Sequence, residues 1–164
     1  MMIVEGTFKI VRLKPQWCQL AIDQLHIMLL GIGLLIAYAM TNFLFHELLA
    51  VLSAVCMLFL AVKTIALART EYIITGEQII YQHGIISHQT DYMELYRVVD
   101  YQQHRTLLQQ LTGLKNISIM SGDRNMPVLT MVGLPQKQDV VHEIRKRVEF
   151  NKKMKSIYEI TNRI

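Results

Sequence analysis

The chain has 164 residues, enough for one domain or for a small domain with a further segment, and this excludes a large multidomain enzyme. Hydrophobic residues make up 52% and charged residues 18%, below the roughly 25% that is typical of soluble domains. The mean hydropathy is +0.27, so the chain is more apolar than a typical soluble domain, and we expect its extra apolar residues to be concentrated in one part. The formal net charge of +4 is too small to indicate a nucleic-acid-binding protein. The two cysteines, Cys18 and Cys56, form neither a disulfide framework nor a zinc-binding spacing.

Two long apolar segments lie in the first half of the chain. Residues 27–45 contain only two conventionally polar members, and residues 48–62 are interrupted by a single serine. A bilayer core about 30 Å thick needs about 20 helical residues. The sequence therefore predicts a transmembrane helical hairpin within residues 20–68, with helices over 20–40 and 48–67.

Two alternatives to this hairpin are open. The segments can be buried helices of a soluble protein, but such helices normally carry a polar stripe, and residues 27–40 show none apart from the phenol of Tyr38. Ala37-Tyr38-Ala39 also resembles a signal-peptide cleavage site, which would give a mature chain that starts at Met40. The long polar lead and the second apolar segment favour the hairpin.

Cationic residues flank the two apolar segments and are absent from the expected turn near residues 41–47. They are Lys9, Arg12 and Lys14 before the first segment, and Lys63 and Arg69 at the end of the second. Lys and Arg resist translocation across a membrane. We therefore expect a multi-pass protein of the inner (cytoplasmic) membrane with both termini in the cytoplasm.

Residue types within the hairpin predict two kinds of contact. Amphipathic side chains near the ends of the spans are expected to anchor them at the membrane interface: Trp17, Tyr38 and Lys63. Small residues in the first span are expected to allow close approach of another helix: Gly31, Gly33 and Ala37. That helix belongs either to the same hairpin or to a neighbouring molecule.

After Arg69 the pattern changes to short β-like segments separated by turn residues. Strands are expected near residues 72–74, 78–83, 86–92, 97–101, 117–119 and 128–132. A short helical turn is expected over residues 106–112, where the alternation of apolar and polar residues breaks. Six strands on short connections predict an antiparallel sheet or a small barrel.

A single amphipathic helix is predicted near the C-terminus. Pro135 suits the first turn of a helix, because its missing N–H would be unpaired there. Val140, Val141, Ile144 and Val148 form one apolar stripe. Such a helix can close the open end of the sheet, and Lys137, Glu143, Lys146 and Arg147 are expected to face solvent.

Four segments carry a family resemblance in their order and spacing. They are Glu71-Tyr72-Ile73-Ile74-Thr75, His83-Gly84, the segment 93–100, and the leucines of 107–114 that lead into Ile117-Ser118-Ile119. Over about residues 20–150 the chain resembles the membrane-anchored bacterial pleckstrin-homology-like (PH-like) family. The resemblance implies an α+β membrane protein in which a bent antiparallel half-barrel of about seven strands follows the hairpin and is capped by a C-terminal helix.

The resemblance leaves one strand to be placed, either near residues 101–105 or in the polar lead, 3–14. It also divides the chain into four parts. These are an N-terminal cytoplasmic or interfacial segment (1–19), the transmembrane hairpin (20–68), a cytoplasmic PH-like domain (69–150) and a basic C-terminal tail (151–164).

Basic residues are concentrated at the C-terminal end. Residues 144–164 contain seven Lys or Arg against two Asp or Glu, whereas residues 70–143 contain five against eight. The candidate contact residues are Arg145, Lys146, Arg147, Lys152, Lys153 and Lys155. They are interpreted as a contact for anionic lipid or for an acidic partner, or else as the solvated end of a helix whose dipole favours cations.

Other kinds of site have little support in the sequence. The first hairpin loop, Thr75-Gly76-Glu77, carries an acid and no base, so inositol-phosphate binding is not expected there. His83, His88 and His104 lack a recognised metal-binding spacing. Because no nucleophile elbow or phosphate-binding loop is present either, we expect a protein that is not an enzyme and needs no metal or cofactor.

These observations predict a membrane-anchored PH-like module that recruits or scaffolds a protein partner. Self-association into a homo-oligomer is compatible with the small residues of the first span and with the exposed edges of an open barrel. The alternative is a module that senses anionic lipid head groups through its basic C-terminal segment. The sequence does not indicate nucleic-acid binding.

Overall fold

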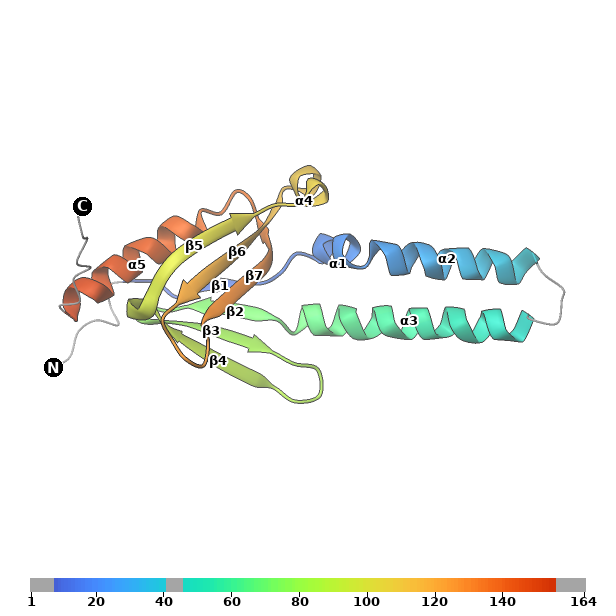
Figure 1. Ribbon diagram of the computed structural model, residues 1–164, viewed down its shortest axis with the longest axis horizontal. Coiled ribbons are helices and arrows are strands. Elements are labelled where there is room, and N and C mark those ends of the chain that lie inside the picture. The colour runs from blue at the N-terminus through green and yellow to red at the C-terminus, as the bar shows by residue number, and fades with distance from the viewer. Residues whose placement is uncertain (1–7, 41–45, 156–164) are drawn as a thin grey trace.

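The structure is a computed structural model that describes residues 8–40 and 46–155. A mixed body of strands and helices occupies one end, and two helices project from it side by side (Figure 1). In chain order the elements are β1 (Val11–Leu13), α1 (Trp17–Asp23), α2 (Leu25–Met40), α3 (His46–Ala68), β2 (Glu71–Ile74), β3 (Gln78–His83), β4 (Gln89–Glu94), the 3-10 turn η1 (Leu95–Arg97), β5 (Val98–His104), α4 (Leu107–Thr112), β6 (Leu114–Ser121), β7 (Val128–Pro135) and α5 (Val140–Met154).

Of the helices in the described ranges, α3 is long and apolar enough by itself to cross a membrane. The first apolar segment is not the continuous helix that the sequence predicts, because α1 and α2 are separated at Gln24 and bent by 72°. The 16 residues of α2 span about 24 Å, so α2 qualifies only together with α1. Residues 41–45, which include most of the expected turn, lie outside the described residues.

The two projecting helices pack through their smallest side chains. Gly31 of α2 is buried, and a Cβ atom built on it would lie 3.6 Å from the Cβ of Cys56. The buried residues of α3 are Ser53 and Cys56, whereas its leucines and valines are mostly exposed. Gly33 has no neighbouring atom within 4 Å and faces away from this contact, so its predicted packing role does not apply within the hairpin.

The strands form two antiparallel sheets, with the orders β1-β2-β3-β4 and β5-β6-β7. Arg12 pairs with Ile73 and Leu13 with Tyr72, so β1 of the polar lead supplies the seventh strand of the described residues. The alternative near residues 101–105 is wrong, because those residues continue β5 as far as His104. Residues 8–13 therefore belong to the body and do not form a separate N-terminal segment.

Several predicted boundaries differ from the structure. The strand expected over 86–92 begins at Gln89, after a loop. Pro135 is the last residue of β7 and does not begin a helix. The C-terminal helix starts at Val140, because the side chain of Asp139 accepts a hydrogen bond from the backbone N–H of His142 and caps that end.

The core lies between the two sheets and α5. Ile144 of α5 is fully buried, and Val140 and Val148 lie on the same side, which confirms most of the predicted apolar stripe. Ile74, Ile79, Met93, Leu95, Ile117, Ile119, Met131 and Leu134 are also fully buried. α5 lies along one side of the body (Figure 1), and this arrangement agrees with a sheet closed by a C-terminal helix.

Arg147 differs from the predicted exposed cation, since only 1% of it is exposed. Its Nη1 donates to the carbonyl oxygens of Ile74 and Thr75 at 2.8 and 3.0 Å. Its Nη2 donates to the carbonyl oxygen of Lys9 at 2.8 Å and to Oε1 of Glu143 at 2.9 Å. Arginine suits this position because its planar fork of N–H groups reaches several acceptors at once.

One turn later, Asn151 is buried in the same contact. Its Nδ2 donates to the carbonyl oxygen of Gly76 at 2.6 Å. Arg147 and Asn151 thus fasten α5 to the first hairpin loop, and Arg147 also holds the residues before β1. The predicted tail from residue 151 begins inside α5, which continues to Met154.

We expect Arg147→Met to lower the free energy of unfolding by about 3 kcal/mol, because it leaves buried carbonyl groups without their donor. Urea unfolding of the detergent-solubilised chain, followed by circular dichroism, measures the change. The control is Lys146→Met on the exposed side of α5, which should change the value by less than about 0.5 kcal/mol. Equal effects of the two substitutions would contradict the role given to Arg147.

Alkaline pH should weaken the body through Tyr72. Burial raises the pKa of Tyr72 to about 12, and its hydroxyl oxygen accepts a hydrogen bond from the backbone N–H of Val132 at 3.3 Å. This pKa is above the ordinary tyrosine value of about 10. The neutral phenol of Tyr72 therefore contributes fully to the stability of the folded state below pH 10, and this contribution is lost as the pH rises toward 12.

Tyr72→Phe should cost about 1 kcal/mol at neutral pH through its lost hydrogen bonds. It should also remove a decline in stability of up to about 3 kcal/mol between pH 10 and pH 12. Unfolding temperatures measured across this range test the difference between the two proteins. Tyr92→Phe, at a residue that is 55% exposed, is the control and should follow the unsubstituted chain. Parallel pH profiles for Tyr72→Phe and the unsubstituted chain would refute this assignment.

Candidate functional site

A cluster of buried amide side chains joins the apolar helices to the body. Gln109 of α4 is 1% exposed, and its Nε2 donates to Oε1 of Gln19 at 2.9 Å and to Oδ1 of Asn116 at 2.8 Å. Gln19 lies in α1, and its own Nε2 donates to Oδ1 of Asp23 at 2.7 Å. Asn116 of β6 also accepts from the backbone N–H of Gly133 at 2.9 Å. We call Gln19, Gln109 and Asn116 the amide junction.

The conformation of α4 places Gln109 in this junction. Thr106 precedes the helix and accepts a hydrogen bond from the backbone N–H of Gln109 at 3.3 Å. Oε1 of Gln109 accepts from the backbone N–H of Thr106 at 3.0 Å, which completes a capping box. Both ends of the Gln109 amide are therefore used, one in forming α4 and one in binding its neighbours.

Gly133 of β7 allows α1 to approach the sheet closely. Its carbonyl oxygen accepts a hydrogen bond from the backbone N–H of Gln16 at 2.9 Å. A Cβ atom at this position would lie 2.7 Å from the Cβ of Gln19, and the backbone has φ +63°. The start of the first apolar segment is thus held against the body.

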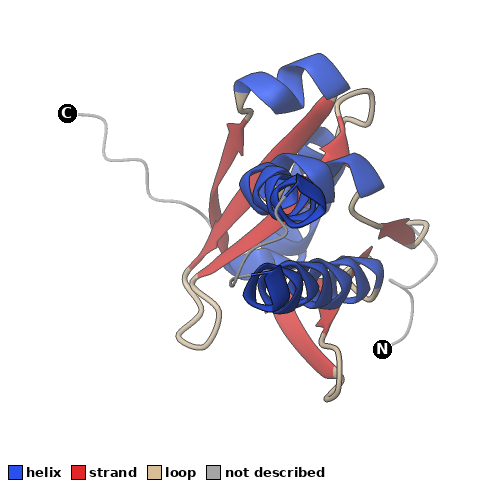
Figure 2. Ribbon diagram, turned by 90° about the vertical axis from the view of Figure 1, so that its right-hand side faces the viewer, coloured by secondary structure: helices blue, strands red, loops and turns tan. Residues whose placement is uncertain are grey.

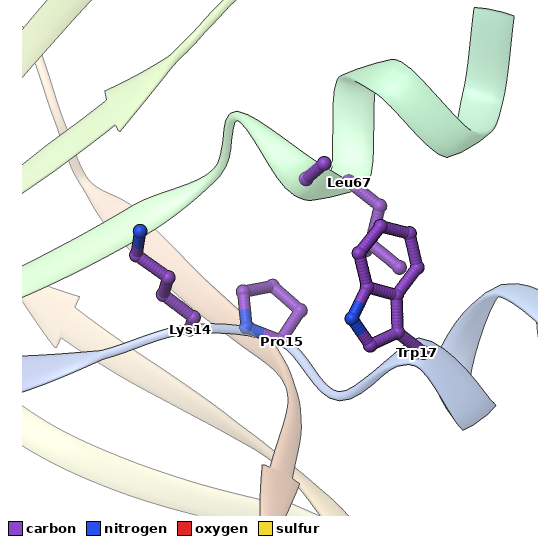
Figure 3. Close-up of a pocket in the computed structure, with 5 residues that line it drawn as sticks. Lys14, Pro15, Trp17 and Leu67 are labelled. Atoms are coloured by element: carbon purple, nitrogen blue, oxygen red, sulfur yellow. The ribbon is translucent and has the colours of Figure 1, made fainter.

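The first predicted interface anchor, Trp17, lies at the body end of the projecting helices. Trp17 is 62% exposed and lies beside Leu67 in a shallow pocket of about 90 Å³ that Lys14, Pro15 and Ala68 also line (Figure 3). The structure therefore places Trp17 where the helices meet the body.

The other two anchors lie along the helices. The ring of Tyr38 stacks on that of His46 with centroids 4.0 Å apart, at the end remote from the body. Lys63 lies on α3 with its Nζ 5.4 Å from the centroid of the Phe59 ring. Ala37, the third of the small residues expected in helix packing, is half-buried in α2.

The predicted basic residues, apart from Arg147, lie on the surface from the middle to the end of α5. Arg145, Lys146, Lys153 and Lys155 are exposed and Lys152 is half-buried; together they form what we call the distal basic surface. The end of α5 is the end of the body that lies farthest from α2 and α3 (Figure 1). The Nζ of Lys155 lies 3.8 Å from the centroid of the Tyr96 ring, which adds an aromatic group to the surface.

The first hairpin loop is tied to α5. The backbone carbonyl groups of Thr75 and Gly76 accept hydrogen bonds from Arg147 and Asn151. Glu77 is the exposed charged residue of the loop.

The histidines are not gathered into a site. Nδ1 of His83 lies 3.7 Å from Oδ2 of Asp91, whereas His88 lies in the loop that follows β3 and His104 ends β5 in the other sheet. Within residues 8–40 and 46–155, no group of three or more His, Cys, Asp or Glu side chains is placed to hold a metal ion.

The sequence interpretation missed the amide junction. Isolated glutamine and asparagine residues usually lie on the surface, and the three residues come from distant parts of the chain. One signal was available, since Thr106-Leu107-Leu108-Gln109 is a capping-box sequence and predicts an ordered helix start at this point.

Two glycine substitutions can distinguish the effect of the close contact between Gly133 and α1 from the effect of a positive φ angle. Gly133 and Gly113 both have positive φ, +63° and +68°, but Gly113 has no neighbouring atom within 4 Å. We expect Gly113→Ala to lower the free energy of unfolding by about 1 kcal/mol through backbone strain. Gly133→Ala should cost clearly more, because it also displaces Gln19.

Urea unfolding of both variants measures this difference. The fluorescence of Trp17, the single tryptophan of the chain, should shift in Gly133→Ala and stay unchanged in Gly113→Ala. The close approach of α1 to β7 would be disproved if both variants lost the same stability and kept the same spectrum.

A comparison with models of protein families identifies the family of this chain. The family model of the bacterial PH domain matches residues 19–148, a segment that includes α2 and α3 as well as β2 to β7. No curated protein and no solved structure gives a significant match. Because the match covers well over half of the sequence and confirms the resemblance seen in it, the chain belongs to the bacterial PH domain family.

Proposed function

We propose that the chain is a non-enzymatic membrane protein in which the α2–α3 pair lies in the cytoplasmic membrane and the PH-like body recruits a protein partner on the cytoplasmic side. Domains of the PH type are generally binding modules without catalytic activity, and a lipid or protein partner fits the family. Both termini and the distal basic surface would then face the cytoplasm.

The observation that carries the membrane assignment is the reversed burial in the apolar helices. In α3, Ser53 and Cys56 are inside, while Leu48, Met57 and Leu58 are 62%, 57% and 67% exposed. A core helix of a soluble protein shows the opposite arrangement. Apolar side chains on the outside and small or weakly polar side chains at the helix contact suit a lipid environment.

The position of the distal basic surface favours a partner over the chain's own membrane. The 15 residues of α5 rise about 22 Å, and the helix runs away from the end where α2 and α3 leave the body. Attraction between cations and a charged bilayer falls off over a Debye length of about 8 Å. The surface is therefore turned toward the cytoplasm, where an acidic protein surface would complement it.

Sensing of anionic lipid through the basic segment is the second candidate. Its support is the charge of residues 144–164, with seven Lys or Arg against two Asp or Glu. With α2 and α3 in the bilayer, however, this segment reaches an anionic surface only if a second membrane faces the body. Recruitment of an acidic protein requires no such arrangement.

Chemical cross-linking in membranes, followed by purification of the full chain in mild detergent, tests the proposal. We expect an acidic partner to be captured in a salt-sensitive manner. The triple variant Lys152→Gln, Lys153→Gln and Lys155→Gln should reduce this capture at least tenfold. The control neutralises two exposed cations elsewhere on the body, Arg124 and Lys137, and should leave capture unchanged.

Three outcomes would contradict the proposal. One is recovery of the monomer alone. Another is recovery of only a homo-oligomer that the triple variant leaves intact. The third is salt-sensitive attachment of the full chain to added anionic vesicles that the triple variant abolishes, with no protein captured, since this would favour lipid sensing.

A further inference from the structure

α4 has its apolar side chains on the outside. Leu107, Leu108 and Leu111 are 79%, 41% and 85% exposed, whereas Gln109 is 1% exposed and belongs to the amide junction. The body therefore holds this short helix through a polar residue and directs its leucines away from the core. In water this is an unfavourable arrangement, because large apolar side chains gain free energy when they leave the solvent.

The connection between β3 and β4 presents a second apolar side chain. Ile86 is fully exposed, and the backbone carbonyl oxygen of the preceding Ile85 accepts a hydrogen bond from Nη1 of Arg69 at 2.7 Å. Arg69 directly follows α3. The tip of this connection is thus fastened to the end of the apolar helix.

These side chains lie at the end of the body from which α2 and α3 project. Along the long axis, α4 and the β3–β4 connection reach the level of the last turn of α3 (Figure 1). Seen along that axis, α4 lies above the two helices and the β3–β4 connection lies below them (Figure 2). Trp17, 62% exposed, lies where the helices meet the body. We call Trp17, Ile86, Leu107, Leu108 and Leu111 the apolar rim.

A flat bilayer surface fits this arrangement better than a protein partner does. The rim residues come from three separate elements, α1, α4 and the β3–β4 connection, which lie around the start of the helix pair at a similar level along the long axis (Figures 1 and 2). An exposed cation lies next to each of these three elements. Lys14 precedes α1, Arg105 precedes α4, and Arg69 bonds to Ile85 in the β3–β4 connection. Cations beside apolar side chains match the phosphate groups that border the acyl region of a membrane.

We propose that the apolar rim inserts into the boundary between head groups and acyl chains of the leaflet that α2 and α3 enter, and so holds the body against the bilayer. This inference depends on the proposed membrane location of α2 and α3. The body then has a fixed orientation, with the distal basic surface directed away from the lipid. In this account Trp17, at the start of α1, lies at the interface.

Quenching of tryptophan fluorescence by brominated lipid tests the inference in the full chain. The starting variant is Trp17→Phe, because Trp17 is the single tryptophan. One new tryptophan is then placed in the rim (Leu111→Trp), in the middle of α3 (Leu58→Trp), or at the first residue of β7 (Val128→Trp), the opposite end of that strand from the one that lies beside Gly113 after α4. The last two sites are 67% and 50% exposed, so none of the three substitutions requires space in the core.

Each variant is reconstituted in two sets of phosphatidylethanolamine and phosphatidylglycerol vesicles, whose acyl chains carry bromine either near the head group or near the chain end. We expect fluorescence to fall at least twofold for Leu111→Trp with bromine near the head group and for Leu58→Trp with bromine near the chain end, and by less than a tenth for Val128→Trp with either. Circular dichroism checks that each variant keeps the fold. The result for Leu111→Trp should not depend on the ratio of protein to lipid.

The outcomes distinguish the two proposals. If Leu58→Trp is quenched and Leu111→Trp behaves like Val128→Trp, the rim is not in lipid, although the membrane location of α3 is supported. If Leu111→Trp is protected from quenching only at high protein density, a second copy of the chain covers the rim and the inference is overturned. If Leu58→Trp is not quenched, α3 is outside the bilayer and both proposals fail.

Discussion

The outward-facing apolar side chains of α2 and α3 constrain every other part of the structure. The body offers these side chains no cover, since the helices project from it and contact each other through Gly31, Ser53 and Cys56. In the proposed membrane location, lipid would cover these side chains, and the bilayer would lie nearest the face of the body from which the helices project.

The body meets this constraint with neutral polar groups. Gln109 donates hydrogen bonds to Gln19 and to Asn116, so the burial of Gln19 and Gln109 beside the apolar helices leaves no unpaired charge. At the far end of the body the buried polar group is the charged Arg147, and four acceptors surround it. The two clusters have complementary roles, because one fixes the body to α1 and the other closes α5 over the sheet. The basic residues of α5 therefore keep a defined position relative to the helices.

Much of the fold could be predicted because its signals are local. Gly76 between two β-branched runs marks the first hairpin, the stripe at Val140, Ile144 and Val148 marks α5, and the apolar composition of residues 48–62 marks α3. The parts that could not be predicted depend on contacts between distant residues. The pairing of β1 with β2 joins Leu13 to Tyr72, and nothing near Leu13 distinguishes a strand from an interfacial segment.

The candidate site shows the same division. The sequence identified the basic residues of α5 as a group, but a charged residue on a helix gives no sign of facing inward. Arg147 is buried because the carbonyl groups of Lys9, Ile74 and Thr75 converge on it, and these come from elements that the chain brings together only on folding. The amide junction was missed for the same reason.

The most direct test of the central claim is extraction of cell membranes that contain the full chain with alkaline carbonate. An integral α2–α3 pair predicts that the chain stays in the membrane pellet and is released only by detergent. Release of the full chain into the supernatant would show that its apolar helices are covered by protein, and it would contradict the account.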